Sequence, residues 1–354
     1  MKLSNIKYFI CCFILLFLVE GTFYPQVNKE QYLENSSVGF PIITNYLPKD
    51  YKAHNQNWAI VKDVRGVMYF GNSAGVLEFD GQNWDLIKIP NSIVRSMAID
   101  DNGNVFIGSA DDFGYLTLDK NSGKKIYKSL ISLLPTKEAF GHIWHTFYVD
   151  KSIFFISKTL IFQFIFDKNN LANPKVNFWK SNSRYKIAHC VNKKLYVLDQ
   201  ETGLLLFDNG SFKTIPGSEI FLTSSIYTML PYDDFGNKIL IATKSAKLFL
   251  YDGNSFSHFN TEAEEFLLKN NIYLPGSKLA DGSFVFNTSK AGIVIINRNG
   301  NIVRKIDMKT GLPDDGVLYS FYSENKLWLA LQNGISAIDL PSPVTFLNQN
   351  AGLK

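Results

Sequence analysis

The chain has 354 residues, of which 46% are hydrophobic and 19% charged, so it has enough apolar material for a large core and is not a disordered protein. Its net charge of +4 is spread thinly, and the absence of a lysine- or arginine-rich run argues against nucleic-acid binding. The three cysteines, Cys11, Cys12 and Cys190, exclude a disulfide scaffold and a cysteine-rich zinc site, and we expect no metal or other cofactor.

The first 21 residues have the pattern of a secretory signal peptide. Lys2 and Lys7 supply the positive end, residues 8–19 form an apolar run, and Val19 and Gly21 are the small residues of a cleavage site. The run is too short for an ordinary membrane span, and no second run of spanning length follows it. We therefore expect a periplasmic or secreted chain without a membrane span after cleavage; an uncleaved N-terminal anchor is the alternative.

A pair of β-rich runs separated by a turn recurs along the rest of the chain. Most second runs begin with glycine, as in Gly75 and Gly334. The repeats are separated by about 43 residues, which is the length of four short strands with their turns. Aligned on the second residue of the first run, the seven copies fall at Tyr69, Phe106, Phe154, Tyr196, Leu240, Val285 and Trp328.

The first copy contains all four strands, at residues 58–62, 67–70, 75–79 and 84–89. The second strand of each copy is apolar on both faces, as expected where a sheet packs between two neighbours. The sequence therefore predicts an all-β fold, a seven-bladed β-propeller of four-stranded blades. A lead-in segment at 22–53 precedes the propeller at 54–354, and the blades lie near 54–91, 92–137, 138–181, 182–222, 223–270, 271–315 and 316–354.

A propeller ring is usually closed by a strand from the opposite terminus that completes the last blade. Residues 41–46 and residues 343–347 both have the composition of such a strand. We favour the C-terminal segment.

Several short motifs do not point to chemistry. His142 and His145 are three positions apart, which puts them on opposite faces of a strand and prevents them from sharing a metal. Residues 100–104 and 233–237 resemble parts of calcium loops, but neither continues to a closing Glu, and both fit hairpin turns. Cys190 is interpreted as a small buried hydrophobe. The sequence contains no nucleophile elbow and no sialidase box, so it does not predict an enzyme.

One set of residues does suggest a ligand site. Because the first strand of each blade lines the central channel, residues at one position of that strand should surround one channel mouth. Aromatic rings stack on sugars, and arginine binds hydroxyls or carboxylates, so the set is typical of an oligosaccharide site; the alternative is that aromatic residues simply favour strands. The six residues are Trp58, Arg95, Trp144, Tyr185, Tyr227 and Tyr273, with Leu318 or Tyr319 in the seventh copy.

The chain also resembles a known family over residues 39–354. The resemblance is carried by residues 39–46, 56–61, 65–71, 75–81, 94–98 and 113–116, which are similar to the opening of two-component-regulator propeller proteins. It implies the periplasmic sensor part of hybrid histidine kinases or of triple-tyrosine transcriptional regulators from Bacteroidetes-type bacteria.

Members of that family continue into a second propeller, an immunoglobulin-like domain, a membrane helix and an output domain. This sequence ends at Lys354 without the corresponding motifs, so kinase activity does not carry over to it. We expect the product of a truncated gene, a receptor fragment or a free-standing sensor, and a homodimer is expected to form through the missing downstream domains. The function we expect is sensing of an extracellular ligand, an oligosaccharide; the alternatives are a protein-interaction scaffold and a secreted polysaccharide-active enzyme.

Overall fold

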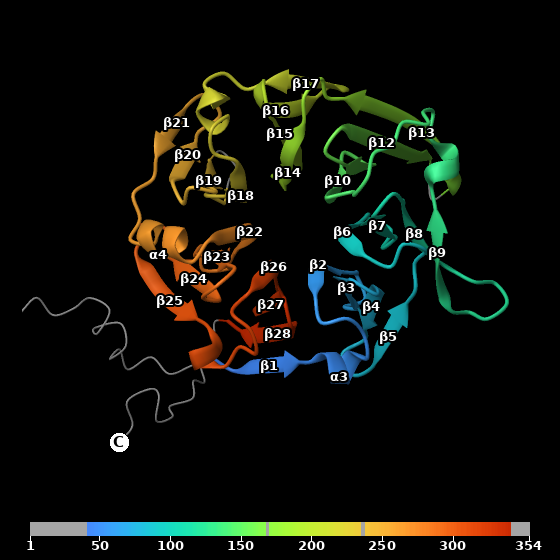
Figure 1. The fold of residues 1–354 in the computed structure, drawn as a ribbon, viewed down its shortest axis with the longest axis horizontal. Coiled ribbons are helices and arrows are strands. Elements are labelled where there is room, and N and C mark those ends of the chain that lie inside the picture. Colours follow the sequence, from blue (N-terminus) through green and yellow to red (C-terminus); the bar gives the residue numbers. More distant parts are fainter. Residues whose placement is uncertain (1–40, 168–169, 235–237, 341–354) are drawn as a thin grey trace, which may run out of the picture. The chain divides into compact units, whose positions relative to one another are not determined.

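The computed structural model describes residues 41–167, 170–234 and 238–340. Seven four-stranded antiparallel sheets follow one another around a ring, which confirms the predicted seven-bladed β-propeller (Figure 1). The predicted signal peptide at 1–21, with Cys11 and Cys12, and the segment at 343–347 lie outside the described residues.

In each blade the first three strands run from the channel outward in chain order (Figure 1). The first four blades comprise β2 (Asn57–Lys62), β3 (Met68–Asn72), β4 (Gly75–Phe79) and β5 (Trp84–Ile87); β6 (Val94–Ile99), β7 (Val105–Ser109), β8 (Phe113–Leu118) and β9 (Lys125–Ser129); β10 (His145–Val149), β11 (Ser152–Ile156), β12 (Leu160–Asp167) and β13 (Asn170–Lys180); β14 (Tyr185–Val191), β15 (Lys194–Asp199), β16 (Gly203–Asp208) and β17 (Ser211–Thr214). The last three comprise β18 (Ile226–Pro231), β19 (Ile239–Thr243), β20 (Leu248–Tyr251) and β21 (Phe256–His258); β22 (Ile272–Lys278), β23 (Phe284–Thr288), β24 (Ile293–Ile296) and β25 (Ile302–Ile306); β26 (Val317–Ser323), β27 (Lys326–Leu331), β28 (Gly334–Asp339) and β1 (Ile43–Tyr46).

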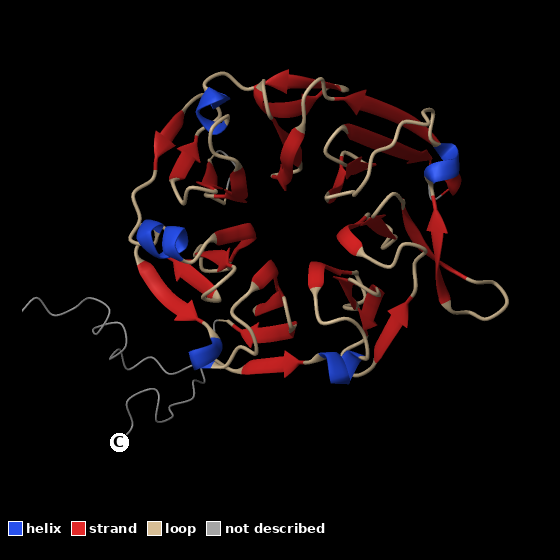
Figure 2. Ribbon diagram, in the orientation of Figure 1, coloured by secondary structure: helices blue, strands red, loops and turns tan. Residues whose placement is uncertain are grey.

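Figure 2 shows the short helices toward the outside of the ring, where they connect blades. They are α3 (Pro48–Tyr51), α4 (Glu264–Lys269), η1 (Ile131–Leu133), η2 (Ser218–Phe221) and η3 (Met308–Thr310).

The core lies between adjacent blades rather than at the centre of the ring. Every residue of β3, β7, β11, β19 and β23 is buried, as predicted for second strands packed on both faces. The junction between blades seven and one illustrates the packing, because Phe70 and Trp328 belong to one apolar cluster with ring centroids 5.6 Å apart. Such contacts position the inner strands around the channel.

The last blade is closed by an N-terminal strand. β1 pairs antiparallel with β28, with Ile43 opposite Ile338 and Tyr46 opposite Ile335. The preference for residues 343–347 is therefore wrong, because β1 already occupies the outer edge of β28. A second contact also holds β1 in this place. The ring of Tyr46 contacts Trp84 of the first blade, so β1 is bound to both the seventh blade and the first. Residues 43–46 belong to the propeller and not to a separate lead-in.

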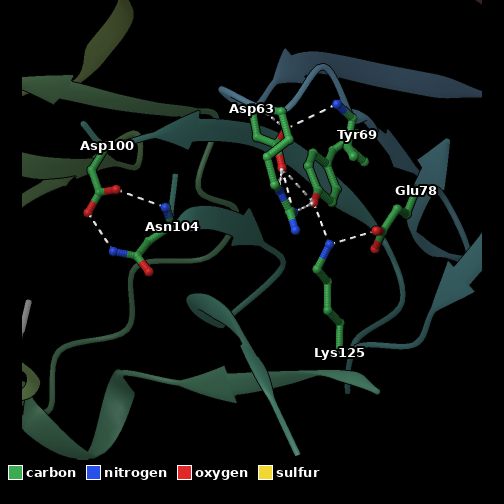
Figure 3. A network of polar contacts seen from close by, with 8 residues as sticks. Asp63, Tyr69, Glu78, Asp100, Asn104 and Lys125 are labelled. Carbon is green, nitrogen blue, oxygen red and sulfur yellow. Dashed lines mark hydrogen bonds and ion pairs between the residues drawn. The ribbon is translucent and has the colours of Figure 1, made fainter. Parts of the chain in front are cut away.

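A polar contact joins the outer strand of the second blade to the second and third strands of the first blade (Figure 3). Lys125 of β9 donates to the hydroxyl of Tyr69 at 2.5 Å and forms an ion pair with Glu78 at 2.6 Å. Both charged side chains are largely shielded, with exposed fractions of 20% and 22%. Blade packing is thus not purely apolar.

Aspartates shape the turns between the first two strands of these blades (Figure 3). Asp63 accepts backbone hydrogen bonds from Arg65 and Val67. Asp100 accepts from both the backbone and the side-chain nitrogen of Asn104, each at 2.8 Å. The run at 100–104 therefore forms a hairpin turn, as predicted. In the similar run at 233–237, residues 235–237 lie outside the described residues.

Candidate ligand site in the central channel

A cavity of about 830 Å³ lies at the centre of the propeller and is lined by inner-strand residues of all seven blades. Its volume falls within the range of small-molecule sites. The structure brings all six residues selected from the sequence to this lining, namely Trp58, Arg95, Trp144, Tyr185, Tyr227 and Tyr273, and it places Leu318 and Tyr319 there as well.

A β-bulge near the start of the inner strand positions several of these side chains. The pairing between first and second strands skips Trp58, Arg95, Tyr227 and Leu318 in four of the blades. A bulged residue is left out of the ladder, which redirects its side chain. In the seventh blade the corresponding residue is therefore Leu318, whereas Tyr319 remains in register.

In the fourth blade the bulge falls one residue later than the position selected from the sequence. Tyr185 pairs with Asp199, and the register shift directly after it leaves Lys186 out of the ladder. Burial, together with the charge of Asp199, raises the pKa of Tyr185 to about 12. Lys186 Nζ donates to the carbonyl of Leu222 at 2.7 Å. At this blade the residue that leaves the ladder is therefore a lysine, and Tyr185 lines the cavity from the position before it.

The third and sixth blades differ in backbone detail. The backbone N–H of Trp144 donates to Ile156 at 2.9 Å just before β10 begins, and this places Trp144 at the position that Trp58 occupies in the first blade. Tyr273 stays paired with Asn287, and the irregularity of this strand follows it. Burial raises the pKa of Tyr273.

Arg95 lies between the two tryptophans. Its guanidinium carbon is 4.1 Å from the ring centroid of Trp58 and 5.1 Å from that of Trp144, both within cation–π range. The indole N–H of Trp58 donates to Ser73 Oγ at 2.9 Å, which fixes the orientation of that ring. The Nε of Arg95 is shielded from solvent and has no hydrogen-bond partner among the described residues. An oxygen of a bound molecule would satisfy this donor.

Two histidines lie in the same lining. His189 is only 7% exposed, and burial lowers its pKa to about 4. Burial also lowers the pKa of His145 to about 3, and proximity to His189 adds to the shift. Both imidazoles are therefore uncharged near neutral pH. Among residues 41–167, 170–234 and 238–340, no group of three potential metal ligands is found.

Cys190 belongs to the lining too, and burial raises the pKa of its thiol to about 11. The thiol is therefore protonated near neutral pH, but Cys190 is half-buried rather than buried as expected. Sequence reasoning did not select Lys186 or His189, because a single lysine or histidine in a strand carries no signal until the register is known.

Several solved structures share the fold of this chain. No protein-family model matches the chain, and no curated protein matches it by sequence. Among solved structures, the extracellular domain assigned to the hybrid two-component system BT3049 from B. thetaiotaomicron matches 84% of this chain with a TM-score of 0.61 and 17% identity. The extracellular domain assigned to the one-component system BT4673 from B. thetaiotaomicron also matches 84%, with a TM-score of 0.63 and 15% identity. The chain has the propeller fold of these extracellular domains.

The chain spans about two fifths of the length of the two signalling-system domains, 42% and 40% respectively. A catalytically inactive virginiamycin B lyase from Staphylococcus aureus with quinupristin matches 84% of this chain and 99% of its own, with a TM-score of 0.63 and 12% identity. Signalling domains and an enzyme therefore share the fold, so function has to be argued from the site. No helix in the described part of the chain is long and apolar enough to cross a membrane.

Proposed function

We propose that this propeller is the ligand-sensing part of a periplasmic signal-transduction receptor and that it binds an oligosaccharide in its central channel. The observation that carries the proposal is the placement of Arg95 between Trp58 and Trp144, with a shielded Nε that lacks a partner, at a cavity lined by every blade. The signal-peptide pattern of residues 1–21 and the fold shared with extracellular domains of bacterial signalling systems support export and sensing.

The site is suited to sensing because its residues come from separate blades. A ligand that contacts Trp58 on β2 and Tyr227 on β18 bridges sheets on different sides of the ring. Signalling requires that the ligand bind one arrangement of the receptor more tightly than another. Because one ligand contacts several blades, its affinity depends on how those blades are arranged, and this dependence provides the required difference in affinity.

We propose binding without turnover. Most glycoside hydrolases use a pair of carboxylates, and the cavity lining in the described part of the chain contains neither Asp nor Glu. Release of shortened sugar during incubation with a bound oligosaccharide would contradict this part of the proposal.

The test is a binding survey of the purified chain against an oligosaccharide array, followed by calorimetric titration of every positive sugar. Arg95→Ala and Trp58→Ala should each abolish binding while the circular dichroism spectrum and melting temperature stay close to those of the parent. Phe178→Ala is the matched control, because Phe178 is an exposed aromatic residue on the outer strand β13. Unchanged binding by the two channel variants would overturn the proposed site.

A further inference from the structure

The charged side chains around the channel are all of one sign. In the described part of the chain, the lining contains six basic residues and no Asp or Glu. Two of the six have partners, since Lys278 pairs with Asp234 at 2.9 Å and Lys186 donates to a backbone carbonyl. The remaining four form no ion pair or side-chain hydrogen bond with any described residue: Arg95, Lys158, Arg184 and Lys244.

Lys158 lies near two of the other unpaired cations, Arg95 and Arg184. Lys158 Nζ lies 5.0 Å from the ring centroid of Trp144, the same ring that Arg95 contacts. Burial lowers the pKa of Lys158, and the charge of Arg184 lowers it further. Like charges held together in a partly shielded site repel one another, and a bound anion relieves that repulsion. The electrostatics of this side of the channel therefore favour a negatively charged ligand.

The stacking of Arg95 determines how such a ligand approaches. The guanidinium carbon of Arg95 lies over the rings of Trp58 and Trp144, so the face of each ring that the arginine covers is not free to stack on a sugar. The N–H groups of a guanidinium point outward in its plane, where a carboxylate or sulfate accepts two of them in parallel. The tryptophans thus hold a cation in place, which differs from the sugar-stacking role expected from the sequence.

Aromatic surface for a sugar ring remains elsewhere in the lining. Tyr227 and Tyr273 are both half-buried residues of the cavity. Tyr273 also lies close enough to Arg95 for each to shift the pKa of the other. An anionic group at Arg95 and a sugar ring beside these tyrosines therefore fit within one ligand.

We infer that the channel selects an acidic oligosaccharide, whose carboxylate or sulfate group binds the in-plane N–H groups of Arg95 beside Lys158 and Arg184. This inference rests on the proposed function and adds a charge requirement to it. The chemistry shared by uronic acids and sulfated sugars is an oxyanion on a sugar ring, and the experiment distinguishes these two sources.

The experiment compares tetragalacturonate with its fully methyl-esterified form, which has the same length but no charge. A chondroitin sulfate tetrasaccharide tests the sulfated source. Binding is measured by calorimetry and by tryptophan fluorescence, which should respond because two indole rings contact Arg95. We expect at least one acidic probe to bind about 10-fold more tightly than the ester, a difference that should shrink as sodium chloride screens the charges.

Substitutions locate the charge requirement. Arg95→Gln should weaken binding of the acidic probe about 10-fold or more, and it should weaken binding of the ester by a smaller factor. Arg95→Lys should give an intermediate loss, because lysine keeps the charge but not the planar pair of donors. Arg304→Gln is the matched control, since Arg304 is a partly buried arginine on β25 outside the cavity lining.

The outcomes separate this inference from the proposed function. Equal affinity for acidic and esterified probes, or tighter binding of the ester, overturns the charge requirement and leaves oligosaccharide binding in place. Tight binding of an acidic probe that Arg95→Gln does not weaken overturns the assignment of Arg95. No binding of any probe, together with an array without positive sugars, overturns the charge requirement and the proposed function alike.

Discussion

Ser336 Oγ donates a hydrogen bond of 2.7 Å to Asn45 Oδ1, and the two residues are 291 positions apart in the sequence. Asn45 also donates through Nδ2 to the carbonyl of Gly311 at 2.9 Å. The contact ties β1 to β28 and to the loop that precedes β26. The ring is therefore closed by non-covalent pairing between the two ends of the described chain, and this pairing has to offset the entropy of closing a very long loop.

Asn45→Ala should lower the free energy of unfolding by about 1–3 kcal/mol, because it removes two hydrogen bonds and leaves the fully buried hydroxyl of Ser336 without its acceptor. Urea unfolding followed by circular dichroism measures the effect. Asn254→Ala, in an exposed turn of the fifth blade, should leave the midpoint unchanged. Equal midpoints for the two variants would show that the closing strand contributes little to stability.

Lys125→Met should destabilise the junction of the first two blades by about 1–3 kcal/mol, since Glu78 would stay largely shielded without its partner. The measurement is again equilibrium unfolding, now with Glu78→Gln and the double variant to form a thermodynamic cycle.

The control for this pair is Lys213→Met, because Lys213 and Asp208 form an ion pair at the same distance, 2.6 Å, but are 61% and 45% exposed. Exposed pairs contribute little, so the expected change is below about 1 kcal/mol. Similar losses in the two methionine variants would contradict the importance of shielding.

Acidification should destabilise the fold through His189. Its pKa is about 4 in the folded chain, against an ordinary value near 6.5, so the unfolded chain binds the proton more readily. The stability associated with the neutral imidazole is complete above pH 6.5 and is lost as the pH falls toward 4, at about 1.4 kcal/mol per pH unit.

His189→Gln should therefore reduce the loss of stability between neutral and mildly acidic pH by about 2 kcal/mol. Urea unfolding at several pH values tests this expectation, with His54→Gln, at an exposed histidine, as the control. A variant as acid-sensitive as the parent would indicate that His189 is already protonated in the folded chain.

Gly108→Ala should destabilise the contact between the second and third blades. A methyl group at Gly108 would lie 2.5 Å from both Ile143 Cγ2 and Ser96 Oγ, where Ser96 makes a 2.8 Å hydrogen bond with Thr146. Overpacking of this kind costs about 1–3 kcal/mol. The fifth blade has Ala242 at the same register position, so the restriction comes from the neighbours of Gly108 rather than from its backbone. A melting temperature equal to that of the parent would contradict this packing argument.

Most of the fold could be predicted because the repeat is local and regular. The spacing between Tyr69 and its six counterparts defines the blade length, and apolar second strands indicate sheets packed on both faces. The closing strand could not be predicted with the same ease. Residues 41–46 and 343–347 have similar composition. The pairing of β1 with β28 joins segments that are nearly 300 residues apart in the sequence.

The candidate site could be predicted in part. Counting back from each repeat selects Trp58, Arg95 and Tyr227, which lie at bulges along the channel. The count of eleven residues that selects Trp58 and Arg95 also selects Tyr185, whereas the bulge in that blade falls on Lys186. A shift of one residue changes which side chain leaves the ladder. The position of the shift is set by how the two strands pair, and amino-acid composition does not specify that pairing.

The sequence by itself determined the number of blades, most of the strands that build them and six of the residues that line the channel, because each of these follows from a local pattern repeated along the chain. Only the tertiary structure decided that β1 closes the ring, that the guanidinium carbon of Arg95 lies over the rings of Trp58 and Trp144, and that the cavity lining in the described part of the chain contains basic but no acidic residues. These features depend on distances between side chains of different blades, which exist only after the ring has closed.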